Sequence, residues 1–328
     1  MELTVVNNIE QQIVAKDDIV TSKGNFIEAN TKQVTLSYLE NDTIIPVFSK
    51  DNETTISHAA FIKTTQDAIS MVYQNYNQAA PNIRISHTIK GRTPSAIGKP
   101  VKELLPNEKT IYYERMAFMI EIPELKESVN GNNLSLVIGG VRAYNRENLY
   151  SKKSIEKFQV FIGYQNLVCT NLCISTDGFK DEMRVTNTLE LHDRIEQLLM
   201  DYDHRKHLGN MERMSKFHLT TEQVAHLIGK MKLYQYLDST KRNGIFPIGF
   251  NDTQVNTIAK SYYQDKNFHL GTDGMINLWN LYNLFTGSVK SSYIDSFLQR
   301  EKQAYEFIQE LVNSLQNEVP NWYLHSIT

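Results

Sequence analysis

The sequence is poor in cysteine and has no long apolar run. Only Cys169 and Cys173 occur among its 328 residues, and a chain of this length can bury a core without a disulfide. The first eighteen residues lack the apolar stretch of a signal peptide. No segment reaches the roughly twenty apolar residues that a membrane-spanning helix needs. We therefore expect a cytoplasmic protein whose two thiols are reduced.

Complete catalytic and cofactor motifs are also missing. Neither Gly-x-Ser-x-Gly nor His-Glu-x-x-His occurs. Six residues separate Gly91 from Gly98-Lys99, where a phosphate-binding loop has four, and Pro100 stands where that loop needs a hydroxyl. Cys169 and Cys173 have no histidine close by in sequence, so two small buried apolar residues explain them better than zinc. We predict no cofactor and no metal, and the missing motifs favour a protein that is not an enzyme.

One enzymatic alternative stays open, since a site can be assembled from residues distant in sequence. Its candidate bases are His87, His204 and His207. A metal site is conceivable where Asp201 and Asp203 share a helical face with His204 and His207. Arg205 and Lys206 intervene, however, and a solvated helix surface has the same composition.

The charge distribution is uneven along the chain. Net charge is −3 from 34 basic and 37 acidic residues. Residues 1–60 carry four basic and nine acidic side chains, whereas residues 61–180 carry fifteen basic and ten acidic ones. A basic middle in a mildly acidic protein could bind an anionic polymer locally, although chance clustering on a solvated surface gives the same pattern.

The periodicity predicts an α+β fold, with a mostly antiparallel sheet in the middle of the chain followed by a helical C-terminal half. We divide the chain into a flexible polar arm (1–32), an α+β sheet domain (33–180) and a helical domain or a helical half packed on the sheet (181–328). Predicted strands cover residues 83–89, 110–122, 134–144 and 158–174. Predicted helices cover residues 57–76, 189–214, 220–231, 252–263, 275–285 and 292–316.

Several single residues sharpen these predictions. Asn130-Gly131 favours a tight turn, so residues 110–144 should form a hairpin, with Pro123 ending its first strand. Gly163 predicts a bulge, and Gly209 a weak point in a long helix. Thr220 and Gln223 form a capping box. Residues 219–229, which include this box, resemble the first helix and turn of a helix-turn-helix. The residues that follow lack its short turn and instead predict one unbroken helix.

The strongest local signal for binding is a mixture of basic and aromatic side chains on presumed strands and loops. Residues 90–109 form a basic loop that could follow a phosphate backbone, or could be an ordinary solvated connection. Single-stranded nucleic acid is bound by such mixtures, because bases stack on aromatic rings while cations hold phosphates. Ordinary packing of tyrosines between strands would give the same pattern. The predicted contacts are Arg92, Lys99, Arg115, Arg142, Tyr144, Arg146, Lys152 and Lys153.

Three stretches carry a family resemblance: residues 158–171 with their Val-Cys-x-Asn element, residues 276–287 with Trp-x-Leu-Tyr-Asn, and residues 45–52. They resemble an uncharacterised domain-of-unknown-function family of phage/plasmid-like proteins, carried by conjugative elements of gut bacteria. The resemblance implies a mobile-element context and supplies no catalytic residues.

These observations lead to one hypothesis and two alternatives. We expect a non-enzymatic nucleic-acid-binding protein of a mobile genetic element, handling single-stranded DNA. The first alternative is a protein-interaction factor that blocks a host defence or restriction system. The second is the enzyme with a site assembled from distant residues.

Overall fold

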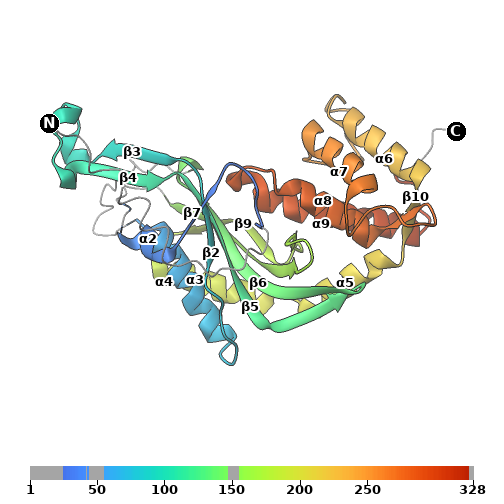
Figure 1. The fold of residues 1–328 in the computed structure, drawn as a ribbon, viewed down its shortest axis with the longest axis horizontal. Helices are drawn as coiled ribbons and strands as arrows, with labels where there is room; N and C mark the ends of the chain where they lie inside the picture. The colour runs from blue at the N-terminus through green and yellow to red at the C-terminus, as the bar shows by residue number, and fades with distance from the viewer. Residues whose placement is uncertain (1–24, 42, 44–54, 147–154, 325–328) are drawn as a thin grey trace, which may run out of the picture.

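The computed structural model describes residues 25–41, 43, 55–146 and 155–324. The predicted α+β class is confirmed, since a curled antiparallel sheet occupies the middle of the chain and helices dominate its C-terminal half (Figure 1). No helix in the described part of the chain is both long and apolar enough to cross a membrane.

The main sheet has the strand order β1-β2-β5-β6-β7-β8, and β9 also pairs with β7. All of its pairings are antiparallel. The bounds of its strands are β1 (Lys32–Val34), β2 (Asn82–Ile85), β5 (Arg115–Val129), β6 (Asn132–Ala143), β7 (Glu156–Asn166), β8 (Leu172–Cys173) and β9 (Phe179–Val185).

The predicted hairpin corresponds to β5 and β6, but its first strand begins at Arg115 and not at residue 110, because residues 109–113 form β4 (Lys109–Tyr113) in a separate sheet. Its turn contains Asn130 at φ 49° and Gly131 at φ 76°, the left-handed conformations that an Asn-Gly turn favours. Pro123 was predicted to end this strand, but β5 continues past it. A register shift between Ile122 and Lys126 accommodates the proline.

Gly163 does not form the predicted bulge. It pairs in regular register with Val137, and the irregularity of β7 falls between Phe158 and Val160 instead. A Cβ at position 163 would lie 2.3 Å from the carbonyl oxygen of Cys173, so glycine permits the close approach of β8.

The segment predicted as one strand over residues 83–89 is divided. β2 joins the main sheet, while β3 (Thr88–Arg92) pairs with β4 (Lys109–Tyr113) in a separate two-stranded sheet. These two strands and the loop between them, residues 88–113, form an arm that projects from one end of the molecule (Figure 1). We call this element the arm; it is distinct from the polar arm predicted for residues 1–32.

Helices cover both faces of the main sheet. β6 contacts both α3 (His58–Val72) and α9 (Ile294–Gln316), and side chains at successive positions of this strand are buried. A strand covered on both faces loses the alternation of buried and exposed residues. The remaining α-helices are α2 (Leu36–Asn41), α4 (Thr188–Asp201), α5 (His204–Ser215), α6 (Thr221–Tyr234), α7 (Asp252–Gln264) and α8 (Leu278–Val289). A second two-stranded sheet pairs β10 (His218–Thr220) with β11 (Met275–Asn277).

The sequence predicted the starts of several helices well. Ser57 caps α3, and Thr220 with Gln223 forms the predicted capping box of α6. The helical stretch 189–214 is two helices, which separate at Tyr202 and Asp203 rather than at Gly209. Asp203 accepts a hydrogen bond from the amide of Lys206, so it begins a new helix as an N-cap.

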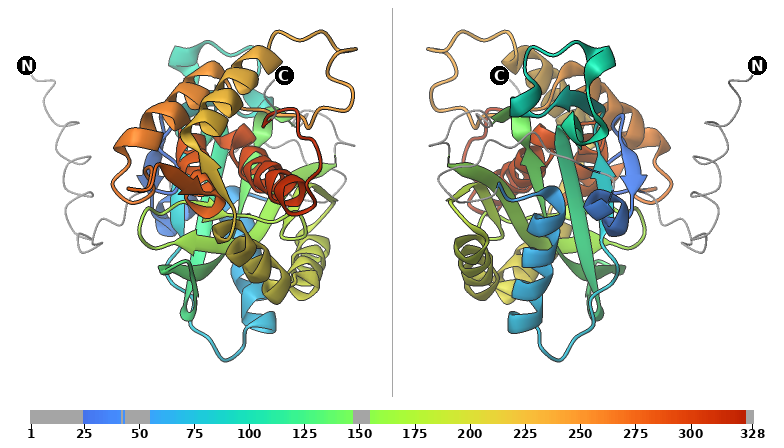
Figure 2. Two further views of the ribbon diagram at one scale, coloured as in Figure 1. Left: turned by 90° about the vertical axis from the view of Figure 1, so that its right-hand side faces the viewer. Right: turned by 90° about the vertical axis from the view of Figure 1, so that its left-hand side faces the viewer.

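The described part of residues 1–32 packs against the helical half. Phe26 and Ile27 are buried, and the amides of Glu28 and Ala29 donate to the carbonyl oxygen of Lys290. Figure 2 shows this segment beside the sheet and the C-terminal helices. Residues 1–24 lie outside the described residues.

Candidate nucleic-acid interface

The projecting arm is a two-stranded ribbon with a folded tip. β3 and β4 pair from Thr88↔Tyr113 at the base to Arg92↔Lys109 at the far end. Three short 3-10 turns, Pro94–Ala96, Val101–Glu103 and Pro106–Glu108, form the tip between them. The predicted basic loop 90–109 is therefore an ordered element of defined shape.

Glu108 holds the tip together from its centre. Its carboxylate accepts hydrogen bonds from the side chain of Lys99 and from the amide of Leu105, at 2.9 Å. Its carbonyl oxygen accepts from the amide of Thr93 at 2.8 Å. The hydrogen bond from Lys99, followed by that from the Leu105 amide, lowers the pKa of Glu108 below its ordinary value. The tip thus stays closed around an ionised carboxylate.

Arg92 and Lys99, both predicted contacts, serve first as braces of this tip. The guanidinium of Arg92 donates to the carbonyl oxygen of Lys99. The ammonium group of Lys99 forms an ion pair with Glu108, but the Lys99 side chain is still 43% exposed. Lys99 can therefore still face an anionic partner.

Other side chains of the arm face solvent. Lys90, Lys102 and Lys109 are exposed, and only one exposed carboxylate, that of Glu103, accompanies them between residues 88 and 113. The tip also exposes three apolar side chains, those of Ile97, Val101 and Leu105. The arm combines positive charge with an apolar end, a combination that the sequence prediction missed because it did not consider the aliphatic residues of this loop.

We expect Glu108→Ala to loosen the tip without unfolding the protein. Hydrogen exchange of the amides between residues 93 and 108 should become about tenfold faster, because Lys99 and the Leu105 amide lose their shared acceptor. Exchange in β5 and β6 should not change. Glu103→Ala is the matched control on the same arm, and equal acceleration in both variants would contradict the central role of Glu108.

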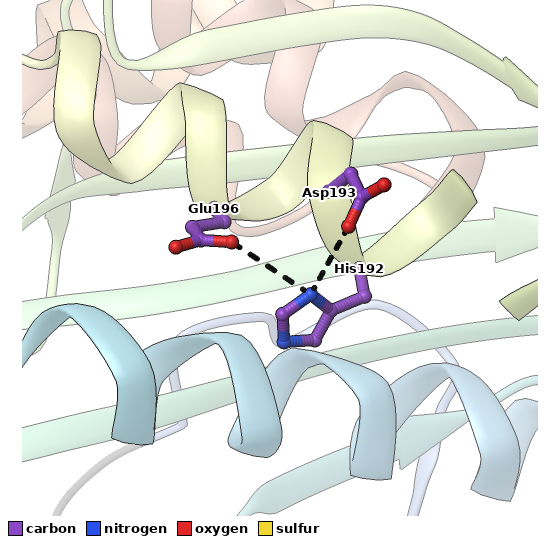
Figure 3. A group of neighbouring side chains, drawn as sticks. All are labelled: His192, Asp193 and Glu196. Carbon is purple, nitrogen blue, oxygen red and sulfur yellow. Dashed lines mark ion pairs between the residues drawn. The ribbon is translucent and has the colours of Figure 1, made fainter. Parts of the chain in front are cut away.

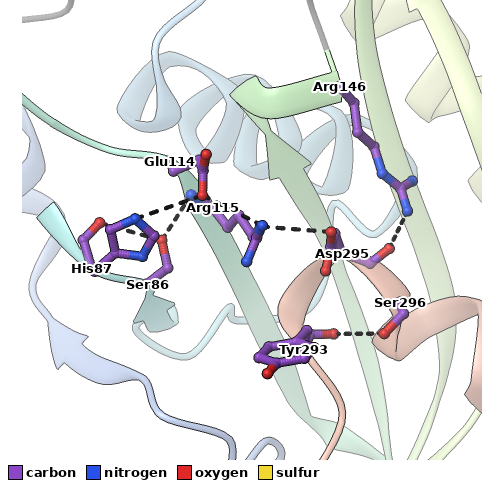
Figure 4. Close-up of polar contacts among 8 residues, drawn as sticks. All are labelled: Ser86, His87, Glu114, Arg115, Arg146, Tyr293, Asp295 and Ser296. Carbon is purple, nitrogen blue, oxygen red and sulfur yellow. Dashed lines mark hydrogen bonds and ion pairs between the residues drawn. The ribbon is translucent and has the colours of Figure 1, made fainter. Parts of the chain in front are cut away.

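Arg115 and Arg146 lie at the base of the arm, where β5 begins and β6 has ended. The Arg115 guanidinium is 3.4 Å from Glu114 and 3.6 Å from Asp295, the second residue of α9. Arg146 donates to the carbonyl oxygen of Asp295 (Figure 4). Both predicted contacts are thus near one another and fasten the arm's base to α9, while Arg146 remains exposed.

Arg142 and Tyr144 are not at the surface, contrary to the prediction of both as contacts. Arg142 is fully buried and lies 2.6 Å from Glu156, with its guanidinium carbon 4.6 Å from the Tyr144 ring centre and 4.5 Å from that of Phe158. Tyr144 is 2% exposed. Arg142 is inside because β6 is covered on both faces, whereas Tyr144, in the 3-10 turn after β6, packs against the rings of His58 and Tyr112. Lys152 and Lys153 lie outside the described residues.

Tyr112 and Tyr113 are also buried, at 8% and 5% exposure. They are the aromatic residues of β4 that lie nearest to the predicted contact Arg115 in the sequence. Buried rings cannot stack on bases. The exposed basic residues of the arm therefore carry the candidate interface, without these tyrosines.

Of the three candidate bases, His87 has a 67% exposed side chain 3.8 Å from Glu114, whereas His204 and His207 lie inside the protein in structural roles. His204 forms hydrogen bonds with the hydroxyls of Tyr73, at 3.0 Å, and Tyr164, at 3.2 Å. Burial lowers its pKa, and lowers that of His207 to about 3, so both imidazoles are neutral at pH 7. Asp201 accepts from Gln197 and Asp203 caps α5, so the four residues do not converge on a metal position.

A different group on α4 has the spacing of metal ligands. One donor atom each of His192, Asp193 and Glu196 lies within 4.8 Å of the others, and within the described ranges no other group of three or more histidines, cysteines and carboxylates does so. Figure 3 shows the imidazole on the side of α4 that faces α3. Asp193 has an 81% exposed side chain, as solvated surface acids commonly do. The pattern His-Asp-x-x-Glu was visible in the sequence.

The two cysteines do not share a strand as predicted. Cys169 lies in a turn before Thr170, which has φ 61°, and its thiol donates weakly to Asn283. Cys173 lies on β8, and both thiols are free. Burial raises the pKa of Cys169 to about 11, and that of Cys173 well above its ordinary value, so neither is a reactive thiolate.

Comparison with known proteins identifies the family. Residues 7–324 match the model of one protein family, described as "Domain of unknown function, B. Theta Gene description (DUF3871)". The chain belongs to this family. The predicted resemblance to a domain-of-unknown-function family is thereby confirmed, while the description names no mobile element and no activity. No curated protein matches the chain, and no solved structure does.

Proposed function

We propose that this member of the family is a non-enzymatic nucleic-acid-binding protein, and that the projecting arm is its principal binding element. The observation that carries the proposal is the exposure of Lys90, Lys102 and Lys109 on a projecting ribbon with a single exposed carboxylate. Lysines on such an element can neutralise phosphates without rearrangement of the body.

The setting of this function is part of the same proposal. The sequence resemblance supports a protein that belongs to a mobile genetic element. Such a protein would bind the nucleic acid of that element in the cytoplasm. The buried tyrosines remove the stacking platform that favoured single strands, so the choice between single-stranded and duplex DNA becomes an outcome of the experiment.

Fluorescence anisotropy with labelled single-stranded and duplex DNA, titrated at several salt concentrations, tests the proposal. We expect affinity to fall steeply with salt. Replacing Lys90, Lys102 and Lys109 by alanine should reduce the slope of log K against log salt by up to about 0.9 for each lysine on duplex DNA.

The matched control replaces three exposed lysines of the helical half, Lys206, Lys260 and Lys266, by alanine. It changes net charge equally but leaves the arm intact, so its salt slope should stay close to that of the wild type. Equal losses in both variants would mean that charge alone matters and would remove the arm from the interface. No binding to either DNA at low salt would overturn the proposed function and favour the alternative of a host protein partner.

A further inference from the structure

The end of the arm exposes apolar side chains that a solvated loop does not need. Ile97, Val101 and Leu105 are 66%, 68% and 56% exposed. No other nine-residue stretch of the described chain exposes three large apolar side chains. Clustered exposure of this kind marks an interaction site more often than isolated surface residues do.

These side chains are held in a fixed arrangement. The carboxylate of Glu108 accepts hydrogen bonds from Lys99 and from the Leu105 amide, and the guanidinium of Arg92 donates to the carbonyl oxygen of Lys99. Pro94, Pro100 and Pro106 further restrict the backbone between the strands. A rigid support lowers the conformational entropy that the three side chains lose when they enter a partner.

The charge around the tip selects an anionic partner. Lys102 lies next to Val101 in the sequence, while Lys90 and Lys109 flank the ribbon, one on each strand. The amino-acid composition of the tip argues against a membrane surface or a protein as this anionic partner. Phenylalanine, tyrosine and tryptophan, which anchor proteins at membrane surfaces and dominate protein hot spots, do not occur between residues 93 and 108.

Isoleucine, leucine and proline are instead among the side chains that wedge between base pairs and kink a duplex. Such wedges insert from the minor groove, and two-stranded ribbons are among the elements that bind there. Lysines on both strands would then lie near the phosphates on either side of that groove.

We propose that the arm tip enters duplex DNA as an apolar wedge, with Ile97, Val101 and Leu105 at its end, and bends the duplex. This inference rests on the proposed function and specifies its substrate as deformable duplex DNA. Sites with a flexible pyrimidine–purine step such as TA should bind more tightly than stiff A-tracts, because less energy is needed to unstack and bend them.

The test separates bending from binding. A duplex of about 30 base pairs, with a donor and an acceptor dye at its two ends, reports bending as a rise in energy transfer, while anisotropy of the same duplex reports affinity. In the wedge variant, Ile97, Val101 and Leu105 are all replaced by serine. We expect it to keep the wild-type salt slope and to lose the rise in energy transfer.

A control variant with Leu233→Ser and Tyr236→Ser, two exposed apolar residues of the helical half, should bend DNA like the wild type. If the wild type binds the duplex without a rise in energy transfer, the wedge is overturned while the proposed function stands. If the wild type binds no DNA at all, both fail. If the wild type binds phosphatidylserine–phosphatidylcholine vesicles but no duplex, and the wedge variant does not bind them, the tip is a membrane anchor and the wedge is overturned.

Discussion

Replacing Arg142 by alanine should destabilise the protein by about 3–5 kcal/mol, the usual effect of removing one partner of a buried ion pair. Glu156, 1% exposed, would then be left charged in the interior. The guanidinium also donates to the carbonyl oxygen of Ile56, whose amide in turn lies 3.1 and 3.2 Å from the two carboxylate oxygens of Glu156. Urea unfolding followed by circular dichroism measures the change.

The double variant Arg142→Met, Glu156→Leu should lose much less stability than Arg142→Ala, because apolar residues of similar size leave no unpaired charge behind. Arg146→Ala is the control. Arg146 is exposed, so its replacement should alter the free energy of unfolding by no more than about 1 kcal/mol. An Arg142→Ala protein with wild-type stability and weakened DNA binding would contradict the structural role and return Arg142 to the interface.

Replacing Glu301 by glutamine should remove a strong pH dependence of stability. Glu301 lies fully buried on α9, and neither carboxylate oxygen has a hydrogen-bond partner among the described residues. Lys290, Cys169, Cys173 and Tyr282 are titratable groups that interact with it. Burial raises its pKa well above 4.5, and the nearby Lys290 ammonium offsets only part of this effect.

The direction of the pH effect follows from that raised pKa. Between the pKa of the unfolded chain and the higher pKa of the fold, the folded protein binds one more proton. Its stability therefore falls as pH rises through this window, with a slope of up to about 1.4 kcal/mol per pH unit. Below the unfolded pKa the contribution is complete. Glutamine cannot ionise, so the Glu301→Gln variant should gain stability relative to the wild type from pH 5 to pH 8.

Urea unfolding of both proteins at pH 5, 6, 7 and 8 measures this difference, and the other titrating groups largely cancel in it. Glu310→Gln changes a partly exposed carboxyl on the same helix and is the matched control. A constant difference between wild type and Glu301→Gln across this range would show that the buried carboxyl does not change its protonation on unfolding.

Most local structure was predictable because it depends on near neighbours in the chain. The Asn130-Gly131 turn fixed the β5–β6 hairpin, since these residues tolerate left-handed φ values. The capping box of α6 was equally visible, because a cap needs only side chains three residues apart. The mixed α+β class followed from the change of hydrophobic period along the chain.

Exposure, in contrast, was decided by the tertiary structure. Arg142 and Tyr144 carry the residue types of a binding surface, yet both are buried. Arg142 lies on β6, which helices contact on both faces, and Tyr144 lies in the turn after β6 against His58 of α3. Whether a polar strand residue faces water depends on which distant helix packs over it, and no local pattern contains that information. Arg92 and Lys99 were predictable as part of a basic segment, but their bracing of the tip depends on their partners, the Lys99 carbonyl oxygen for Arg92 and Glu108 for Lys99.

The sequence by itself determined the secondary structure of the hairpin, the helix caps and the basic character of residues 61–180. Only the tertiary structure decided that residues 88–113 leave the main sheet and project as an arm. Ser86 marks that point, because its backbone amide still bonds to the carbonyl oxygen of Arg115 while β3 pairs with β4 alone. Strand pairing is chosen by contacts between distant segments, so a stretch that alternates regularly in sequence could still be divided between two sheets.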